Sequence, residues 1–75
     1  MRTTEMVYER ALRLAAEGRD EESSIRELLE TALGKRVALV MARQRIMDQA
    51  DLGDEVASRA AALIDATIAT SALAD

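Results

Sequence analysis

The sequence predicts an all-α protein, a three-helix unit that forms one domain over residues 1–75. Three observations predict this fold class. Apolar residues recur every three or four positions in three segments, which is the spacing of one helix face. Alanine and other good helix formers dominate, and the chain has one aromatic residue, Tyr8, and no proline. A length of 75 residues is that of a single domain.

The first helix is expected over about residues 4–17. Thr3 or Thr4 can cap its N-terminus, and Glu5 then lies in the first turn, where a negative charge is favourable. One face carries the apolar residues Val7, Tyr8, Ala11, Leu14 and Ala15. Gly18 follows where a left-handed residue commonly ends a helix.

The second helix is expected to be the longest, over about residues 24–50. Ser24 and Glu27 match a capping box, and apolar residues at helical spacing follow as far as Met47. Gly34 interrupts this pattern, so it either kinks one long helix or separates two shorter ones. A strand over residues 37–42 is a third interpretation, but the sequence offers no second strand to pair with it.

The third helix is expected over about residues 54–73, after a turn at residues 51–54. Gly53 can end the preceding helix, and Asp54 can cap the new one. The apolar face of this helix consists of Val56, Ala60, Leu63, Ile64 and Ile68. Its opposite face is small rather than charged, which is unusual for a helix that faces solvent.

Excess apolar surface predicts self-association. Residues 37–42 are all apolar, and Asp65 is the single charge within residues 60–74. For a chain of this size, the free energy gained by apolar burial and the free energy lost with conformational entropy nearly cancel, each at about 110 kcal/mol. A single folded copy is therefore expected to be only marginally stable. We therefore expect an intertwined helical-bundle homodimer. Its expected interface residues are Val37, Leu39, Val40, Met41, Ile46, Met47, Leu63, Ile64 and Ile68.

The composition excludes several classes of function. The chain has no His and no Cys, which excludes zinc or haem sites built on these residues, imidazole or thiol catalysis, and disulfides. Its carboxylates form no clear acid/base pair, and no phosphate-binding glycine loop is present. We expect no cofactor, no metal and no catalytic residue. The expected function is that of a non-enzymatic module, an adaptor or regulatory protein, which binds itself and another protein through helical surfaces.

Arg36 and Arg43 support an alternative function. They are seven residues apart, so they share one side of a helix, and their neighbours on that side are apolar. Two guanidiniums there need partners, either acidic groups of a neighbouring helix or subunit, or a bound carboxylate or phosphate. The arrangement resembles the cationic pocket of all-helical chorismate mutases, which are intertwined dimers. The two arginines thus favour an anion site, enzymatic or sensory, and the resemblance implies a dicarboxylate as its ligand.

A second resemblance covers about a third of the chain, from Ala32 to Ala57. The segment is similar to the core of the ANTAR family of RNA-binding antiterminators, which are three-helix modules. The residues in register are Ala32, Leu33, Arg36, Ala42, Arg43, Met47 and Ala57. Gln44, Lys35 and Ser58 depart from the family pattern. The resemblance implies an RNA-binding function.

Charge argues against nucleic acid as a partner. Residues 35–47 hold four cations, but these do not line one side of a helix, and the net charge of the chain is −4. No apolar run is long enough to cross a bilayer, since the longest uncharged stretch covers the nine residues 66–74. Without a visible secretory signal, we expect a cytoplasmic protein with no membrane partner.

Overall fold

A computed structural model describes residues 2–49 and 53–70. Within these residues the chain forms four α-helices and no strand: α1 (Thr3–Glu17), α2 (Glu21–Thr31), α3 (Arg36–Asp48) and α4 (Asp54–Ile68). The predicted all-α class is confirmed. The predicted count of three helices is wrong, because the expected second helix is two helices. The suggested strand at residues 37–42 is part of α3.

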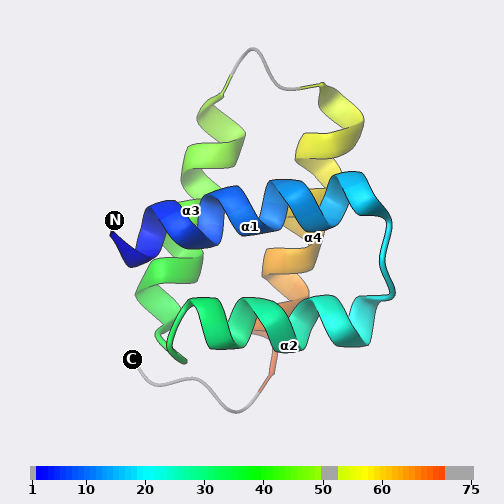
Figure 1. The fold of residues 1–75 in the computed structure, drawn as a ribbon. Helices are drawn as coiled ribbons and strands as arrows, with labels where there is room; N and C mark the ends of the chain where they lie inside the picture. Colours follow the sequence, from blue (N-terminus) through cyan, green and yellow to red (C-terminus); the bar gives the residue numbers. More distant parts are fainter. Residues whose placement is uncertain (1, 50–52, 71–75) are drawn as a thin grey trace.

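The four helices form two antiparallel pairs that cross each other. Figure 1 shows α1 and α2 side by side in one layer, with α3 and α4 behind them and running across them. The N-terminal helix α1 packs against all three others, and α4 does the same. By contrast, α2 and α3 do not pack against each other, so each keeps a side that no other described helix covers.

The core lies between the two layers and draws on every helix. The expected apolar face of α1 is confirmed, because all five of its residues are buried. On α4, Ala60 and Ile64 are buried, while Val56, Leu63 and Ile68 pack partly buried against the core. The largest fully buried apolar side chains are Leu14, Leu28, Leu39, Ile46, Ile64 and Val7. One folded chain therefore encloses a core of its own.

The long helix expected over residues 24–50 ends at Thr31 because the backbone turns left-handed. Leu33 and Gly34 have φ values of 56° and 68°. The amide of Gly34 donates to the carbonyl of Leu29 at 3.0 Å, and that of Leu33 donates to Glu30 at 3.1 Å. These two bonds form a Schellman motif, which satisfies the last carbonyls of α2. Of the two interpretations of Gly34, the separation into two helices is the correct one.

The N-terminus of α2 also differs from the expectation. The carboxylate of Asp20 accepts a hydrogen bond from the amide of Ser23 at 2.9 Å, and the helix begins at Glu21. This hydrogen bond lowers the pKa of the Asp20 carboxyl below its ordinary value of 3.8. The predicted capping box is wrong because α2 begins one turn earlier. Ser24 is therefore buried inside the helix rather than at its end.

The remaining helix ends follow the sequence signals in part. Gly18 ends α1 with a φ of 67°, as expected, whereas Arg2 occupies the N-cap position in place of a threonine. Gly53 is the N-cap of α4, and Asp54 is the first helical residue. Residues 50–52 and 71–75, which belong to the expected turn and to the end of the expected third helix, lie outside the described residues. Among the described helices, none has the length and apolar character needed to cross a membrane.

Candidate protein-interaction surface

Large apolar side chains are exposed mainly on α3. Six large apolar residues of the described chain are exposed, and four of these belong to this helix. They are Val37 at 57%, Val40 at 48%, Met41 at 55% and Met47 at 57% relative accessibility. Because α3 packs only against α1 and α4, these side chains lie on the side that faces away from the bundle. Exposed apolar clusters of this kind mark interaction sites in soluble proteins.

The exposed residues of α3 follow the spacing of one helix face. Val37, Val40, Gln44 and Met47 are separated by three, four and three residues, and Met41 lies beside them. We call these five residues the outer face of α3. The opposite side of the same helix is buried in the core and consists of Ala38, Leu39, Ala42 and Ile46. The helix therefore has apolar residues on two sides, of which the bundle covers one.

The residues predicted for an interface divide between these environments. Val37, Val40, Met41 and Met47 belong to the outer face of α3. Leu39, Ile46 and Ile64 are buried in the core of the single chain, while Leu63 and Ile68 are half-buried on α4. The structure therefore concentrates the accessible part of the predicted interface on one helix.

One edge of the outer face is formed by Arg43, which contacts α4. Its Nε donates to the carboxylate of Asp65 at 2.7 Å. The single charge of the otherwise uncharged residues 60–74 thus lies opposite an arginine of α3 in the same chain. This pair uses one of the two guanidiniums proposed for an anion site. Arg36, the other, is exposed and takes part in an interaction of its own.

The other edge is formed by Arg45, which contacts α1. Its guanidinium carbon lies 4.2 Å from the centre of the Tyr8 ring, within the range of a cation–π interaction. Tyr8 itself is buried. The two arginines at the edges of α3 thus connect it to its two neighbouring helices, and the apolar outer face lies between them.

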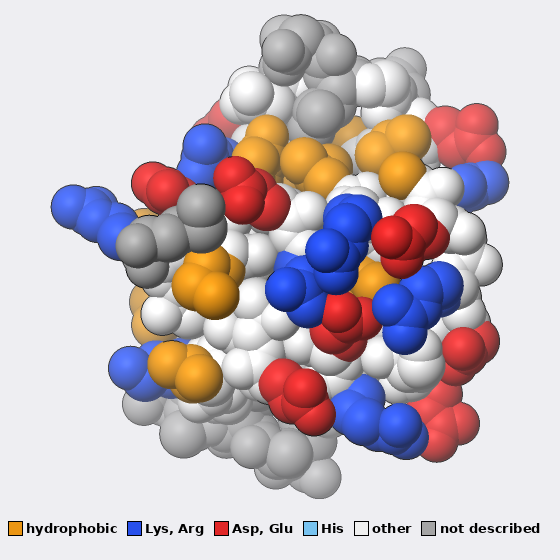
Figure 2. All heavy atoms as spheres, in the orientation of Figure 1, with side chains coloured by type: hydrophobic (Ala, Val, Ile, Leu, Met, Phe, Trp, Pro, Cys, Tyr) orange, Lys and Arg blue, Asp and Glu red, His pale blue; other side chains and the backbone are white. Residues whose placement is uncertain are grey.

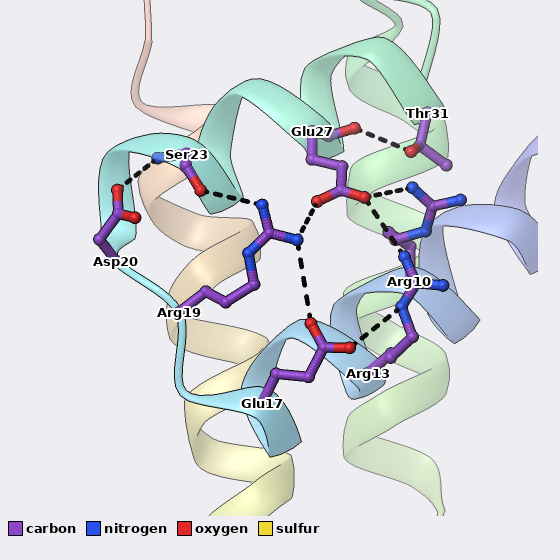
Figure 3. A network of polar contacts seen from close by, with 8 residues as sticks. All are labelled: Arg10, Arg13, Glu17, Arg19, Asp20, Ser23, Glu27 and Thr31. Carbon is purple, nitrogen blue, oxygen red and sulfur yellow. Dashed lines mark hydrogen bonds and ion pairs between the residues drawn. The ribbon is translucent and has the colours of Figure 1, made fainter.

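The opposite layer carries a network of ion pairs that the sequence did not reveal. Glu27 of α2 accepts Arg10 at 2.6 Å and Arg13 at 3.3 Å from α1, as Figure 3 shows. Arg19, in the α1–α2 loop, reaches the same carboxylate at 3.1 Å. Glu17 lies within 3.9 Å of both Arg13 and Arg19. Alternating signs along α1 were visible in the sequence, but their convergence on Glu27 depends on how α2 docks.

The structure also contains a shallow hollow of about 480 Å³ where α1, α2 and α4 meet. Its floor is apolar, with Leu14 and Leu63, and its rim carries Arg19 and Arg59. Both arginines are paired, Arg59 with Glu55 at 2.6 Å and Arg19 with Glu27. Across residues 2–49 and 53–70, no group of three acidic side chains is arranged to hold a metal ion. One carboxylate, that of Glu21, also lines the hollow.

Comparison of the chain with protein-family models, with curated proteins and with solved structures finds no match. The resemblance to the antiterminator family thus has no support from a family match. Within the resembling segment, Leu33 and Gly34 separate two helices rather than continuing one.

Proposed function

We propose that the protein is a small, non-enzymatic protein–protein interaction module that forms a homodimer through the outer face of α3. The observation that carries this proposal is the set of exposed apolar side chains Val37, Val40, Met41 and Met47 on one side of one helix. Covering them removes apolar surface from water at about 25 cal/mol per Å², which favours association. The proposed role is that of an adaptor or regulatory protein that acts as this dimer.

The dimer that we propose joins two folded chains side by side. The sequence favoured an intertwined dimer because the core of one chain was expected to be incomplete. However, the core residues Leu39, Ile46 and Ile64 are covered within a single chain. Association then adds stability by mass action, and the apparent melting temperature should rise with protein concentration.

A backbone feature next to this face supports the same interpretation. Leu33 is 68% exposed and has a left-handed backbone, a conformation that favours Gly or Asn and is costly for a leucine. Neither burial nor backbone preference within the chain accounts for a leucine at this position. Leu33 lies three positions before the start of α3, so a partner that covers the beginning of this helix can also contact the Leu33 side chain.

Sedimentation equilibrium and light scattering over a range of concentrations test the proposal. The natural chain is expected to dimerise reversibly, and Val40→Lys is expected to make it monomeric because it places a charge on the outer face. The matched control is Met6→Lys, since Met6 is also an exposed large apolar residue, at 41%, but lies on α1. A natural chain that remains monomeric up to millimolar concentration would overturn the proposal. So would a dimer that Val40→Lys leaves intact.

A further inference from the structure

We propose that the two copies pair their α3 helices in parallel and in register, as a short two-stranded coiled coil. This inference rests on the proposed homodimer and specifies how its two subunits recognise each other. It is carried by the order of residue types along the exposed side of α3. The spacing of the apolar residues defines the seam. The position of one amide sets the register, and the charges at the edges set the direction.

The outer face of α3 has the heptad spacing of a coiled-coil seam. Val37 and Gln44 are seven residues apart and take the a positions, while Val40 and Met47 take the d positions. All four residues are exposed. Because no Leu occupies a d position, the preference for two strands depends on the polar residue at the second a position, Gln44. The helix has 13 residues, so the seam holds two a and two d layers over about 20 Å.

The amide of Gln44 favours equal register. In a parallel, in-register pair, Gln44 lies opposite Gln44 of the partner subunit, and the two amides can donate to and accept from each other. A shift by one layer would bury the amide against an apolar side chain and leave it without a hydrogen bond, which is costly. A single polar residue at an a position is a known determinant of register. Within the chain, the side-chain nitrogen of Gln44 donates to Asp48 at 3.2 Å, so both side chains lie on the exposed side.

The charges beside the seam favour the parallel direction. Arg36 and Arg43 occupy the g positions, and Met41 and Asp48 occupy the e positions. A parallel pair brings each g position next to the following e position of the other helix, so Arg43 meets the partner's Asp48 twice by symmetry. Arg43 donates to Asp65 through Nε, so its terminal amino groups can donate to a second acceptor. An antiparallel pair would instead bring the g positions of the two helices together. Arg36 and Arg43 would then lie beside the same arginines of the other copy, which is repulsive.

The charge pattern identifies a second copy as the occupant. One helix supplies both the cation and the anion needed across a two-fold axis, which is the self-complementarity of an isologous interface. The contact is small, because one pair of helices about 20 Å long lies at the low end of interface sizes. We therefore expect a reversible dimer with a dissociation constant in the micromolar range, on the order of 1–100 μM.

Disulfide trapping tests the direction, because the chain has no Cys of its own. Val37→Cys and Met47→Cys are prepared separately and oxidised with oxidised glutathione, alone and as an equal mixture. In the parallel dimer each variant crosslinks to itself, because identical positions are adjacent. In an antiparallel dimer these positions are about 15 Å from their own copies and close to each other, so only the mixture crosslinks. Met6→Cys is the control for random collision.

The outcomes separate this inference from the proposed function. Rapid self-crosslinking of both variants, well above that of Met6→Cys, supports the parallel pair. Crosslinking only in the mixture overturns the parallel pair and leaves the homodimer standing. A dimer by sedimentation with no crosslink above the control also overturns it, and it moves the interface away from α3. A monomer by sedimentation rejects the proposed homodimer itself.

A charge substitution gives an independent measure. Asp48→Lys is expected to raise the dissociation constant about tenfold, because two opposite-charge contacts become two like-charge contacts. Glu22→Lys is the control, since Glu22 is an exposed acid on α2, away from the seam. An unchanged dissociation constant for Asp48→Lys would overturn the parallel pairing. Sedimentation equilibrium at two salt concentrations measures the effect, which should shrink as salt increases.

Discussion

Helices α2 and α3 each have one side that no other described helix covers, and these two exposed sides differ in character. On α2 the charges converge, and Glu27 receives three arginines from α1 and the loop that follows it. Figure 2 shows this face, where side chains of both signs mix over the middle of the molecule. On α3, Arg43 and Arg45 lie at the edges of the helix, where they contact Asp65 and Tyr8, and the exposed centre is mainly apolar.

The contrast between α2 and α3 shows how a small bundle can fix all its helices and still expose an apolar surface. α2 packs against α1 and α4 and is linked to α1 by ion pairs, and it buries only two residues fully within its own span, Ser24 and Leu28. α3 is fixed by four buried apolar residues and by one cation contact at each edge. The apolar side chains of its outer face therefore add little to the core of the single chain. On α2, by contrast, Glu27 already has three arginine partners within the chain.

The sharpest test of the contrast within α3 compares two adjacent residues. Leu39 is fully buried, whereas Val40 is 48% exposed. Leu39→Ala should lower the free energy of unfolding by about 2–5 kcal/mol, because it removes buried methyl groups and leaves a cavity. Val40→Ala should change it by no more than about 0.5 kcal/mol when measured in the monomeric concentration range. Urea unfolding followed by circular dichroism measures both. Equal losses would show that the outer face is part of the core.

The ion-pair network on the α2 side should have a smaller but measurable effect. Glu27→Gln is expected to cost about 1–2 kcal/mol, because one half-buried carboxylate serves three guanidiniums. Its control is Glu22→Gln, which removes a single exposed pair with Arg26 at 3.6 Å and should cost less than about 0.5 kcal/mol. Thermal melts of both variants give the comparison. If the two costs were equal, the network would act as ordinary surface charge.

The sequence predicted the parts of this fold that depend on local pattern. The apolar face of α1, its end at Gly18 and the all-α class all follow from spacing and helix-ending signals within one segment. The division of the middle helix was visible at Gly34 but undecided, because the Schellman motif also requires Leu33 to adopt a left-handed backbone. Nothing in its side chain predicts that conformation.

The candidate site could be predicted only in part. The excess of apolar residues over residues 37–42 was evident, but their division into a buried and an exposed side depends on where α1 and α4 dock. For the same reason, the partner of Arg43 and the convergence of three arginines on Glu27 were hidden. These contacts join residues 8 to 22 positions apart in different helices or in a loop, and helical periodicity relates neighbours only within one helix.

A buried hydroxyl on α2 gives a prediction of the opposite sign. Ser24 is fully buried, and its hydroxyl has no hydrogen-bond partner among the described residues. Ser24→Ala should therefore stabilise the protein by about 1 kcal/mol beyond the gain in helix propensity. Ser58→Ala provides that propensity gain alone, because Ser58 is an exposed serine within α4. Denaturant unfolding of the two variants isolates the difference. A gain at Ser24 no larger than that at Ser58 would mean that the hydroxyl is satisfied.

The smallest expected effect concerns pH and the N-terminus of α2. The hydrogen bond from Ser23 lowers the pKa of Asp20 in the folded state, so above pH 3.8 this carboxylate stabilises the fold. The unfolded chain then binds the proton more readily, and the contribution is lost as the pH falls from 3.8 through the folded pKa.

Asp20→Asn keeps an acceptor for the Ser23 amide but has no charge to favour the positive end of the helix dipole. The natural chain should melt at a higher temperature than this variant at pH 7, and the gap should close in acid. On α3, whose N-cap Lys35 makes no side-chain capping bond, Lys35→Gln should show no such acid-dependent gap. A constant gap between the natural chain and Asp20→Asn would show that the stabilisation comes from cap geometry and not from the charge.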